Sequence, residues 1–109
     1  MSTTTPDTIV RPRPETDTKP KLLPPYHVIL ENDDFHSMEF VVEVLRKVLG
    51  VQLEKAFDLM LKAHETGRAV IWTGPKEVAE LKAEQITTLR EKKNGRDLGP
   101  LGCCIEPAA

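Results

Sequence analysis

Hydrophobic and polar positions along the chain predict six elements in the order β-α-α-β-α-β. Apolar residues recur at helical spacing in three segments, and three short β-rich runs lie before, between and after them. The predicted strands are residues 26–30, 68–73 and 101–105, and the predicted helices run from Ser37 to Gly50, over 51–65, and from Pro75 to the Asn94-Gly95 pair. This order predicts an α+β fold, a small three-stranded antiparallel sheet covered by three helices on one face.

The apolar positions also predict which helix faces are buried. In the first helix, after the predicted N-cap Ser37, they cover a wide arc, so we expect burial on more than one side; they are Met38, Val41, Val42, Val44, Leu45, Val48 and Leu49. In the second helix they form one face, which would include Leu53, Ala56, Phe57, Met60, Leu61 and His64. A histidine on such a face requires a polar partner.

Composition and charge limit the remaining possibilities. Among 109 residues, segment 1–24 is rich in Pro and Thr and is predicted to be disordered, which leaves residues 25–109 as one domain. A net charge of −2 without a basic stripe argues against nucleic acid, and no apolar run is long enough for a membrane span. The adjacent Cys103 and Cys104 suit a reduced state. Without a secretion signal, the chain reads as a soluble cytoplasmic protein.

Three polar residues lie where the first strand ends and the first helix has not yet begun. Asn32, Asp33 and Asp34 supply acceptors and negative charge, which suit a cation. Apolar side chains of the following helix, such as Met38 and Val41, lie close by in sequence. Taken singly, the acidic turn reads equally well as a solvated loop and His64 as a core histidine. Together they predict a binding site in which the turn faces His64.

Enzymatic chemistry is less well supported than binding. A thiol enzyme would use Cys103 or Cys104, but no predicted helix N-terminus or basic group is near to lower a thiol pKa. A metal site would draw on His27, His36 and His64, which do not share a metal-ligand spacing. The sequence also contains no glycine-rich phosphate loop. We therefore expect no catalytic residues, no metal and no cofactor.

Several motifs together resemble the ClpS family, the adaptors of the bacterial Clp protease that are also called N-recognins. They are PYHVILENDDFHSMEFVVEVL, the LMLKAH segment that ends at His64, GRAVI, KEVAELK and the terminal PLGCCIE. The resemblance covers residues 25–106 in order. It implies an adaptor that binds substrates with a free N-terminal Leu, Phe, Tyr or Trp, an N-degron, and delivers them to the AAA+ unfoldase ClpA or ClpC.

The resemblance also implies roles for individual residues. Asn32, Asp34 and His64, supported by Asp33, would bind the charged α-amino group, and His64 would have to be neutral to accept a hydrogen bond. The side-chain pocket would be formed by Met38, Val41, Met60, Ala63 and Leu101, with Met38 as a gate against β-branched residues. Glu77 and Lys82 correspond to positions that face the unfoldase in the family.

The sequence departs from the family at the edge of the predicted pocket. Glu31 stands in place of an aliphatic residue, His36 and Ser37 replace a common Thr-Pro, and Gly102 interrupts a common Leu pair. Ala63 is smaller than the usual Val, which would enlarge the pocket floor toward Trp or Tyr. Two alternatives remain open. One is a ClpS-like modulator that docks on the unfoldase without reading N-termini, and the other is a docking module like the C-terminal domain of the ribosomal stalk protein.

Overall fold

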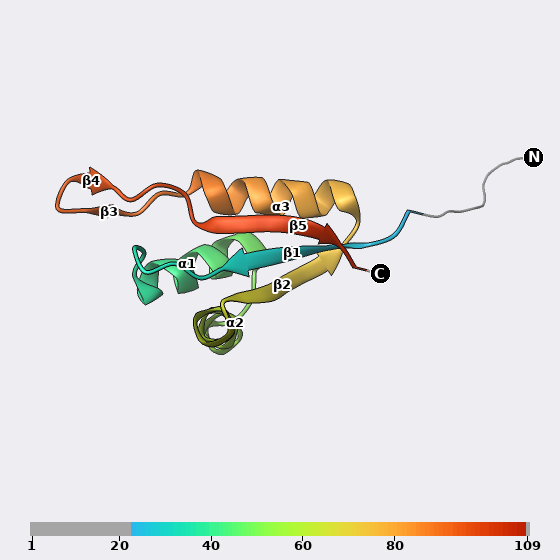
Figure 1. Cartoon of the computed structure of the whole chain (residues 1–109), viewed down its shortest axis with the longest axis horizontal. Helices are drawn as coiled ribbons and strands as arrows, with labels where there is room; N and C mark the ends of the chain where they lie inside the picture. The colour runs from blue at the N-terminus through green and yellow to red at the C-terminus, as the bar shows by residue number, and fades with distance from the viewer. Residues whose placement is uncertain (1–22, 109) are drawn as a thin grey trace, which may run out of the picture.

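A computed structural model of the chain describes residues 23–108. Its elements are β1 (Tyr26–Glu31), α1 (Met38–Leu49), α2 (Leu53–Thr66), β2 (Arg68–Gly74), α3 (Lys76–Thr88), β3 (Lys92–Lys93), β4 (Arg96–Asp97) and β5 (Gly102–Pro107). The predicted α+β fold is confirmed: a three-stranded antiparallel sheet in the order β2-β1-β5 carries three helices (Figure 1). The β3–β4 hairpin is an addition that the sequence analysis did not predict.

Strand β1 is the central strand, and it carries the longest continuous run of buried residues among the strands. Val28, Ile29 and Leu30 are all buried, and Leu30 pairs with Ala69 of β2 and Cys103 of β5. Successive side chains of a strand point to opposite faces of the sheet. Val28 and Leu30 accordingly belong to the main core, whereas Ile29 is buried on the opposite face.

The helices form the second layer of the fold. Helix α3 lies along β5 and β1, α2 lies beside β2, and α1 contacts both α2 and α3. The core between the layers is apolar; its fully buried large side chains are Val28, Val44, Leu45 and Ile86. Contact with two other helices explains why α1 is buried over a wide arc, as predicted.

The ends of α1 agree with the capping signals in the sequence. The Ser37 hydroxyl accepts a hydrogen bond from the backbone N–H of Phe40 at 3.1 Å, which is the N-cap interaction. At the other end, Gly50 adopts a left-handed conformation with φ of 69°, which an L side chain rarely adopts.

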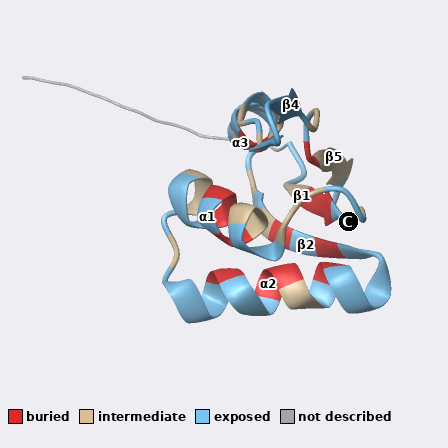
Figure 2. Ribbon diagram, turned by 90° about the vertical axis from the view of Figure 1, so that its left-hand side faces the viewer, coloured by how far each residue is buried: buried red, intermediate tan, exposed pale blue. Residues whose placement is uncertain are grey.

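The buried face of α2 differs from the predicted one. Ala56, Leu59, Met60 and Ala63 are buried, at the i, i+3, i+4, i+7 spacing of one helix face. Leu53 and Phe57 lie beside that face with 50% and 47% of their surfaces exposed, and His64 is also exposed. Figure 2 shows that the buried residues of α2 are all turned toward α1 and β2. The prediction that His64 projects from the buried face was therefore wrong.

Helix α3 is shorter than predicted. It ends at Thr88, and Leu89 after it is extended. The hydroxyls of Thr87 and Thr88 donate hydrogen bonds to backbone carbonyls of the preceding turn. The Asn94-Gly95 pair does not end the helix. Both residues have positive φ, 55° and 77°, and they form the two-residue turn that joins β3 to β4.

The predicted disordered segment 1–24 falls almost entirely outside the described residues, so its state stays a prediction. Among the helices of residues 23–108, none is long and apolar enough to cross a membrane.

Candidate functional site

The residues that the sequence analysis assigned to the site line a single cavity of about 220 Å³. Its lining consists of Leu30, Glu31, Asn32, Asp33, Asp34, His36, Met38, Val41, Met60, Ala63, His64 and Leu101. Leu30 is the only member of this set that had not been predicted. The structure thus brings together the acidic turn, the α2 residues and Leu101, which lies just before β5. The role of each residue stays a prediction.

A backbone hydrogen bond places the acidic turn beside the end of α2. The N–H of Asn32 donates to the carbonyl of Gly67 at 3.0 Å, directly after β1. Gly67 is the left-handed C-cap of α2, and its own N–H donates to Ala63. His64 therefore lies close to the turn, and the partial negative charge at the C-terminus of α2 adds to that of the carboxylates.

The inner wall of the cavity is apolar and rigidly held. Met60, Ala63 and Leu101 are each no more than 3% exposed, and they come from α2 and from the segment just before β5. Val41 is half-buried on α1. Met38, one turn earlier, is 46% exposed and stands at the cavity mouth. The side chain at position 63 is only a methyl group, so the floor of the cavity keeps space for a ligand.

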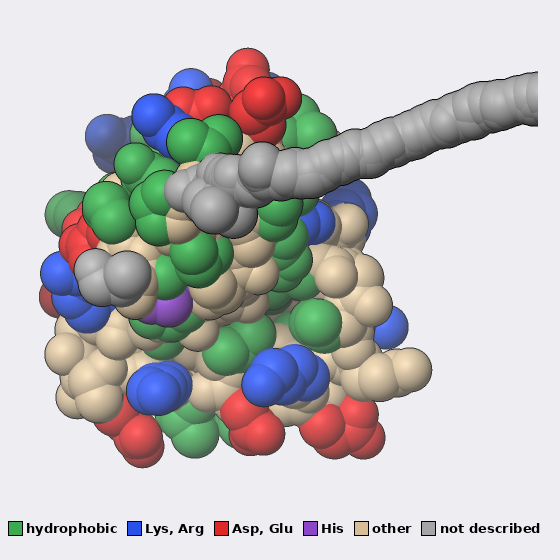
Figure 3. Space-filling model, turned by 90° about the vertical axis from the view of Figure 1, so that its right-hand side faces the viewer, with side chains coloured by type: hydrophobic (Ala, Val, Ile, Leu, Met, Phe, Trp, Pro, Cys, Tyr) green, Lys and Arg blue, Asp and Glu red, His purple; other side chains and the backbone are tan. Residues whose placement is uncertain are grey.

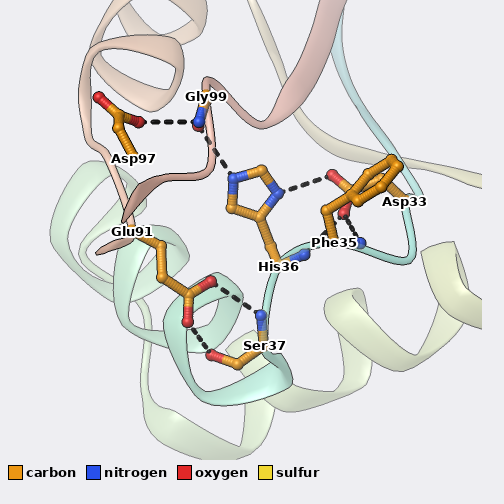
Figure 4. A network of polar contacts seen from close by, with 7 residues as sticks. All are labelled: Asp33, Phe35, His36, Ser37, Glu91, Asp97 and Gly99. Carbon is orange, nitrogen blue, oxygen red and sulfur yellow. Dashed lines mark hydrogen bonds and ion pairs between the residues drawn. The ribbon is translucent and has the colours of Figure 1, made fainter. Parts of the chain in front are cut away.

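One half of the acidic turn is occupied by internal hydrogen bonds (Figure 4). Oδ1 of Asp33 accepts from the backbone N–H groups of Phe35 and His36, both at 2.9 Å, and Oδ2 lies 2.9 Å from Nδ1 of His36. Burial would raise the pKa of Asp33, but the backbone hydrogen bonds from His36 and Phe35 outweigh it and hold the pKa below its ordinary value. Asp33 is therefore a structural carboxylate with few lone pairs left.

A second carboxylate ties the start of α1 to the segment that follows α3. Glu91 accepts from the Ser37 N–H at 2.8 Å through Oε1 and from the Ser37 hydroxyl at 2.7 Å through Oε2 (Figure 4). Burial acts to raise the pKa of Glu91, and these two bonds lower it below the ordinary value. The sequence analysis missed this residue because its partner is 54 positions away and no local pattern marks it.

The other half of the turn is open. Within residues 23–108, the side chains of Asn32, Asp34 and His64 make no hydrogen bond to another protein group, and all three are exposed. His64 therefore does not form the expected hydrogen bond to a residue of the turn. Instead, three groups with unused lone pairs surround the mouth of an apolar cavity, an arrangement that suits a cationic group joined to a hydrophobic one.

Glu31 forms the rim next to β5. Its side chain is exposed, and Oε2 lies 3.9 Å from the Cys104 sulfur. A Cβ at position 102 would approach the Cβ of Glu31 to 3.2 Å, so Gly102 leaves the room that this side chain needs.

The two cysteines lack the properties of a nucleophile. Burial, followed by the influence of Cys104 and Glu31, raises the pKa of Cys103 to about 12, and burial also raises that of Cys104. Neither thiol ionises readily at neutral pH. No group of three potential metal ligands occurs in the described part of the chain.

Comparison with known proteins identifies the family. The family described as ATP-dependent Clp protease adaptor protein ClpS matches residues 21–103, which is most of the chain. The chain belongs to the ClpS family. The expectation drawn from the sequence motifs is thereby confirmed.

Individual ClpS relatives agree with this assignment. The chain is 38% identical over 104 residues to the ATP-dependent Clp protease adapter protein ClpS of Vibrio cholerae, covering 94% of this chain and 92% of the relative. It is 41% identical over 88 residues to ClpS of Vibrio atlanticus, covering 79% of each. Among solved structures, Agrobacterium tumefaciens ClpS2 bound to L-phenylalaninamide has a TM-score of 0.69 and 33% identity, covering 77% of this chain and 96% of that one.

The two residues expected to face the unfoldase lie in different surroundings. Glu77 is exposed and lines a surface groove of about 580 Å³ with Pro75, Val78 and residues 23–25. Figure 3 shows this end of the molecule, where hydrophobic side chains gather with charged groups around them. Lys82 is half-buried rather than exposed, because its Nζ donates to the Val48 carbonyl at 3.3 Å and lies 5.3 Å from the centre of the Trp72 ring.

Proposed function

We propose that this ClpS protein captures polypeptides through a free N-terminal residue that is bulky and hydrophobic. The observation that carries the proposal is the composition of this cavity: an apolar wall, with three polar side chains at its mouth that make no hydrogen bond within residues 23–108. An α-amino group is mostly charged at neutral pH, and it stands one bond from the carbon that bears the side chain. A first residue therefore presents a cation and a hydrophobic group at the spacing that this cavity requires.

In the proposed complex the α-ammonium donates its three hydrogens to Asn32, Asp34 and His64. Asn32 offers its amide oxygen, Asp34 its carboxylate, and His64 one ring nitrogen when neutral. An acetylated terminus has neither the charge nor the donors, and an internal residue lacks them as well. Selection for a free N-terminus thus follows from hydrogen-bond chemistry.

The size and lining of the cavity select the side chain. A volume of about 220 Å³ lies below the ~300–1,000 Å³ of sites for drug-sized ligands and suits a single residue. Burial of a Leu or Phe side chain contributes ~1.5–3 kcal/mol. Each hydrogen bond to a charged group adds ~1.5–3 kcal/mol. Less the cost of association, micromolar affinity of about −8 kcal/mol is expected, and neither half suffices alone.

The related A. tumefaciens structure supports the same ligand chemistry. It is described as ClpS2 bound to L-phenylalaninamide. That ligand has a free α-amine, an aromatic side chain and an amide in place of the carboxylate, as the first residue of a peptide does. The methyl group of Ala63 on the floor favours large first residues of the set Leu, Phe, Tyr and Trp.

Delivery of the captured chain to the Clp protease in the cytoplasm completes the proposal. The adaptor role belongs to the family, and we propose ClpA or ClpC as the unfoldase that receives the substrate. The groove beside Glu77 provides apolar surface for such a contact. The ammonium group of Lys82 already bonds the Val48 carbonyl and lies over the Trp72 ring. Lys82 therefore contacts the unfoldase only through its methylene groups, or after its ammonium group has left the Trp72 ring.

Peptide titration tests the binding half of this proposal. Labelled peptides that begin with Leu, Phe, Tyr or Trp are expected to bind with micromolar Kd in fluorescence anisotropy, and their acetylated forms are expected to bind at least tenfold more weakly. Equal affinity for free and acetylated peptides would rule out amine recognition and would favour a modulator that docks without reading N-termini. A peptide with the same sequence behind an N-terminal Ser controls for nonspecific contact.

A further inference from the structure

His36 lies at the buried centre of the occupied half of the acidic turn. Its side chain is 2% exposed, and its ring stacks on Phe40 with centroids 5.6 Å apart. Both ring nitrogens have partners: Nδ1 is 2.9 Å from Oδ2 of Asp33, and Nε2 is 3.0 Å from the carbonyl oxygen of Gly99 (Figure 4). His36 is therefore enclosed between the turn and the chain segment that precedes β5.

Both partners of His36 require a donor from its ring. A carbonyl oxygen only accepts hydrogen bonds, and an ionised carboxylate does the same. Asp33 is ionised at neutral pH, because its hydrogen bonds hold its pKa below the ordinary value despite burial. A ring with one N–H and one acceptor nitrogen satisfies only one of the two partners. Both contacts are hydrogen bonds only when each ring nitrogen carries a proton.

The two contacts of His36 join opposite sides of the proposed peptide site. Asp33 lies between Asn32 and Asp34, the two turn residues that are open to the cavity. Gly99 lies two residues before Leu101, which forms part of the apolar wall. The Glu91–Ser37 pair makes a second connection nearby, but it reaches the start of α1 and not the turn itself.

We propose that His36 is a positioning residue of the peptide site: its ring, bonded at both nitrogens, orients the acidic turn beyond the point where the pairing of Glu31 with Gly102 ends. This inference rests on the proposed function, because it concerns the same site. When one of the two ring contacts is lost, Asn32 and Asp34 lose their fixed orientation toward the cavity. Peptide affinity therefore depends on a ring that donates at both nitrogens.

Nuclear magnetic resonance on the unmodified chain gives the first test. Ring ¹⁵N shifts are expected to show a proton on both nitrogens of His36 under the conditions in which the protein binds peptide. A single neutral tautomer at neutral pH, in protein that binds peptide at full affinity, would overturn the inference. This measurement needs no variant and does not depend on whether a peptide binds.

The second test compares peptide affinity at one fixed pH. A Phe-initiated peptide is expected to bind His36→Gln about tenfold more weakly than the parent chain, or about 1.4 kcal/mol, because one amide nitrogen replaces the two ring nitrogens. The control His27→Gln removes a ring that bonds Thr73 at 2.7 Å, remote from the cavity lining, and should follow the parent.

The outcomes separate this inference from the proposed function. If the parent chain fails to bind the Phe-initiated peptide at any pH, the proposed function fails, and the ring protonation still reports on His36. If the peptide binds His36→Gln and the parent chain with equal affinity, the positioning role is wrong while amine recognition stands.

Discussion

Asp33 and Asp34 are neighbours in sequence, yet their carboxylates lie in opposite environments. Asp33 accepts two backbone N–H groups and faces the buried His36. Asp34 is exposed, and within the described residues its side chain has no hydrogen-bond partner. The comparison teaches that one residue type serves two purposes within a single turn: the first carboxylate builds the turn, and the second is left for a ligand.

Truncation of Asp33 is expected to have the largest effect. Asp33→Ala should lower the free energy of unfolding by about 3 kcal/mol, because it leaves a buried histidine nitrogen and two backbone donors without an acceptor. Asp34→Ala, one residue away and exposed, should change it by less than about 0.5 kcal/mol. Chemical denaturation measures both. Equal losses of stability would show that the two carboxylates are not divided in this way.

Truncation of the open half should affect binding instead. Asp34→Ala and His64→Ala are each expected to weaken binding of a Phe-initiated peptide at least tenfold, about 1.4 kcal/mol, with unchanged stability. The matched control is Asp58→Ala, which removes an exposed carboxylate from α2 outside the cavity lining. Parent affinity in both variants would remove these two residues from the site, and a loss in the Asp58 variant would indicate a general charge effect.

Acidification should produce the smallest effect. The pKa values of Asp33 and Glu91 are held below their ordinary values by hydrogen bonds that outweigh the effect of burial. Carboxylates of this kind contribute stability above their ordinary pKa of about 4, and the contribution is lost as the pH falls through the lower folded value.

Glu91→Gln is the variant that isolates one of these contributions. It should reduce the acid-induced loss of stability by less than about 1 kcal/mol, because its carboxylate is only partly buried. Thermal unfolding measured between about pH 5 and pH 3 detects this difference. A loss that is as steep in the variant as in the parent chain would show that Glu91 does not titrate differently in the folded state.

The main fold was predictable from the sequence because its signals are local. Helical spacing gave the three helices, and Ser37 and Gly50 are standard caps for α1. The acidic turn and His64 were paired because a histidine on an apolar face was expected to need a polar partner. Met60 and Ala63 were implied by the resemblance to the ClpS family. The helical spacing placed the buried face of α2 wrongly. This face includes Ala56 and Ala63, whose small side chains carry little weight in a hydrophobic pattern.

The features that escaped prediction depend on distant contacts. The β3–β4 hairpin has strands of two residues each, all polar, so no alternation marks them, and Asn94-Gly95 was read as a helix end. The burial of His36 and the pairing of Glu91 with Ser37 arise only when the segment after α3 folds back on the turn. Lys82 appeared exposed by helix position, but its long stem reaches the Trp72 ring.

The bond between His36 and Gly99 spans 63 positions in the sequence, and the Ser37–Glu91 pair spans 54. Synthesis on the ribosome runs from the N-terminus, so the acidic turn and His64 emerge before the segment that closes the cavity around them. Loops of this length also close late in folding, because their entropy must be lost before the contact forms. A nascent chain consequently holds the polar groups of the proposed site without a pocket, and under the proposed function it gains affinity for an N-terminal residue only when its last strand has been made.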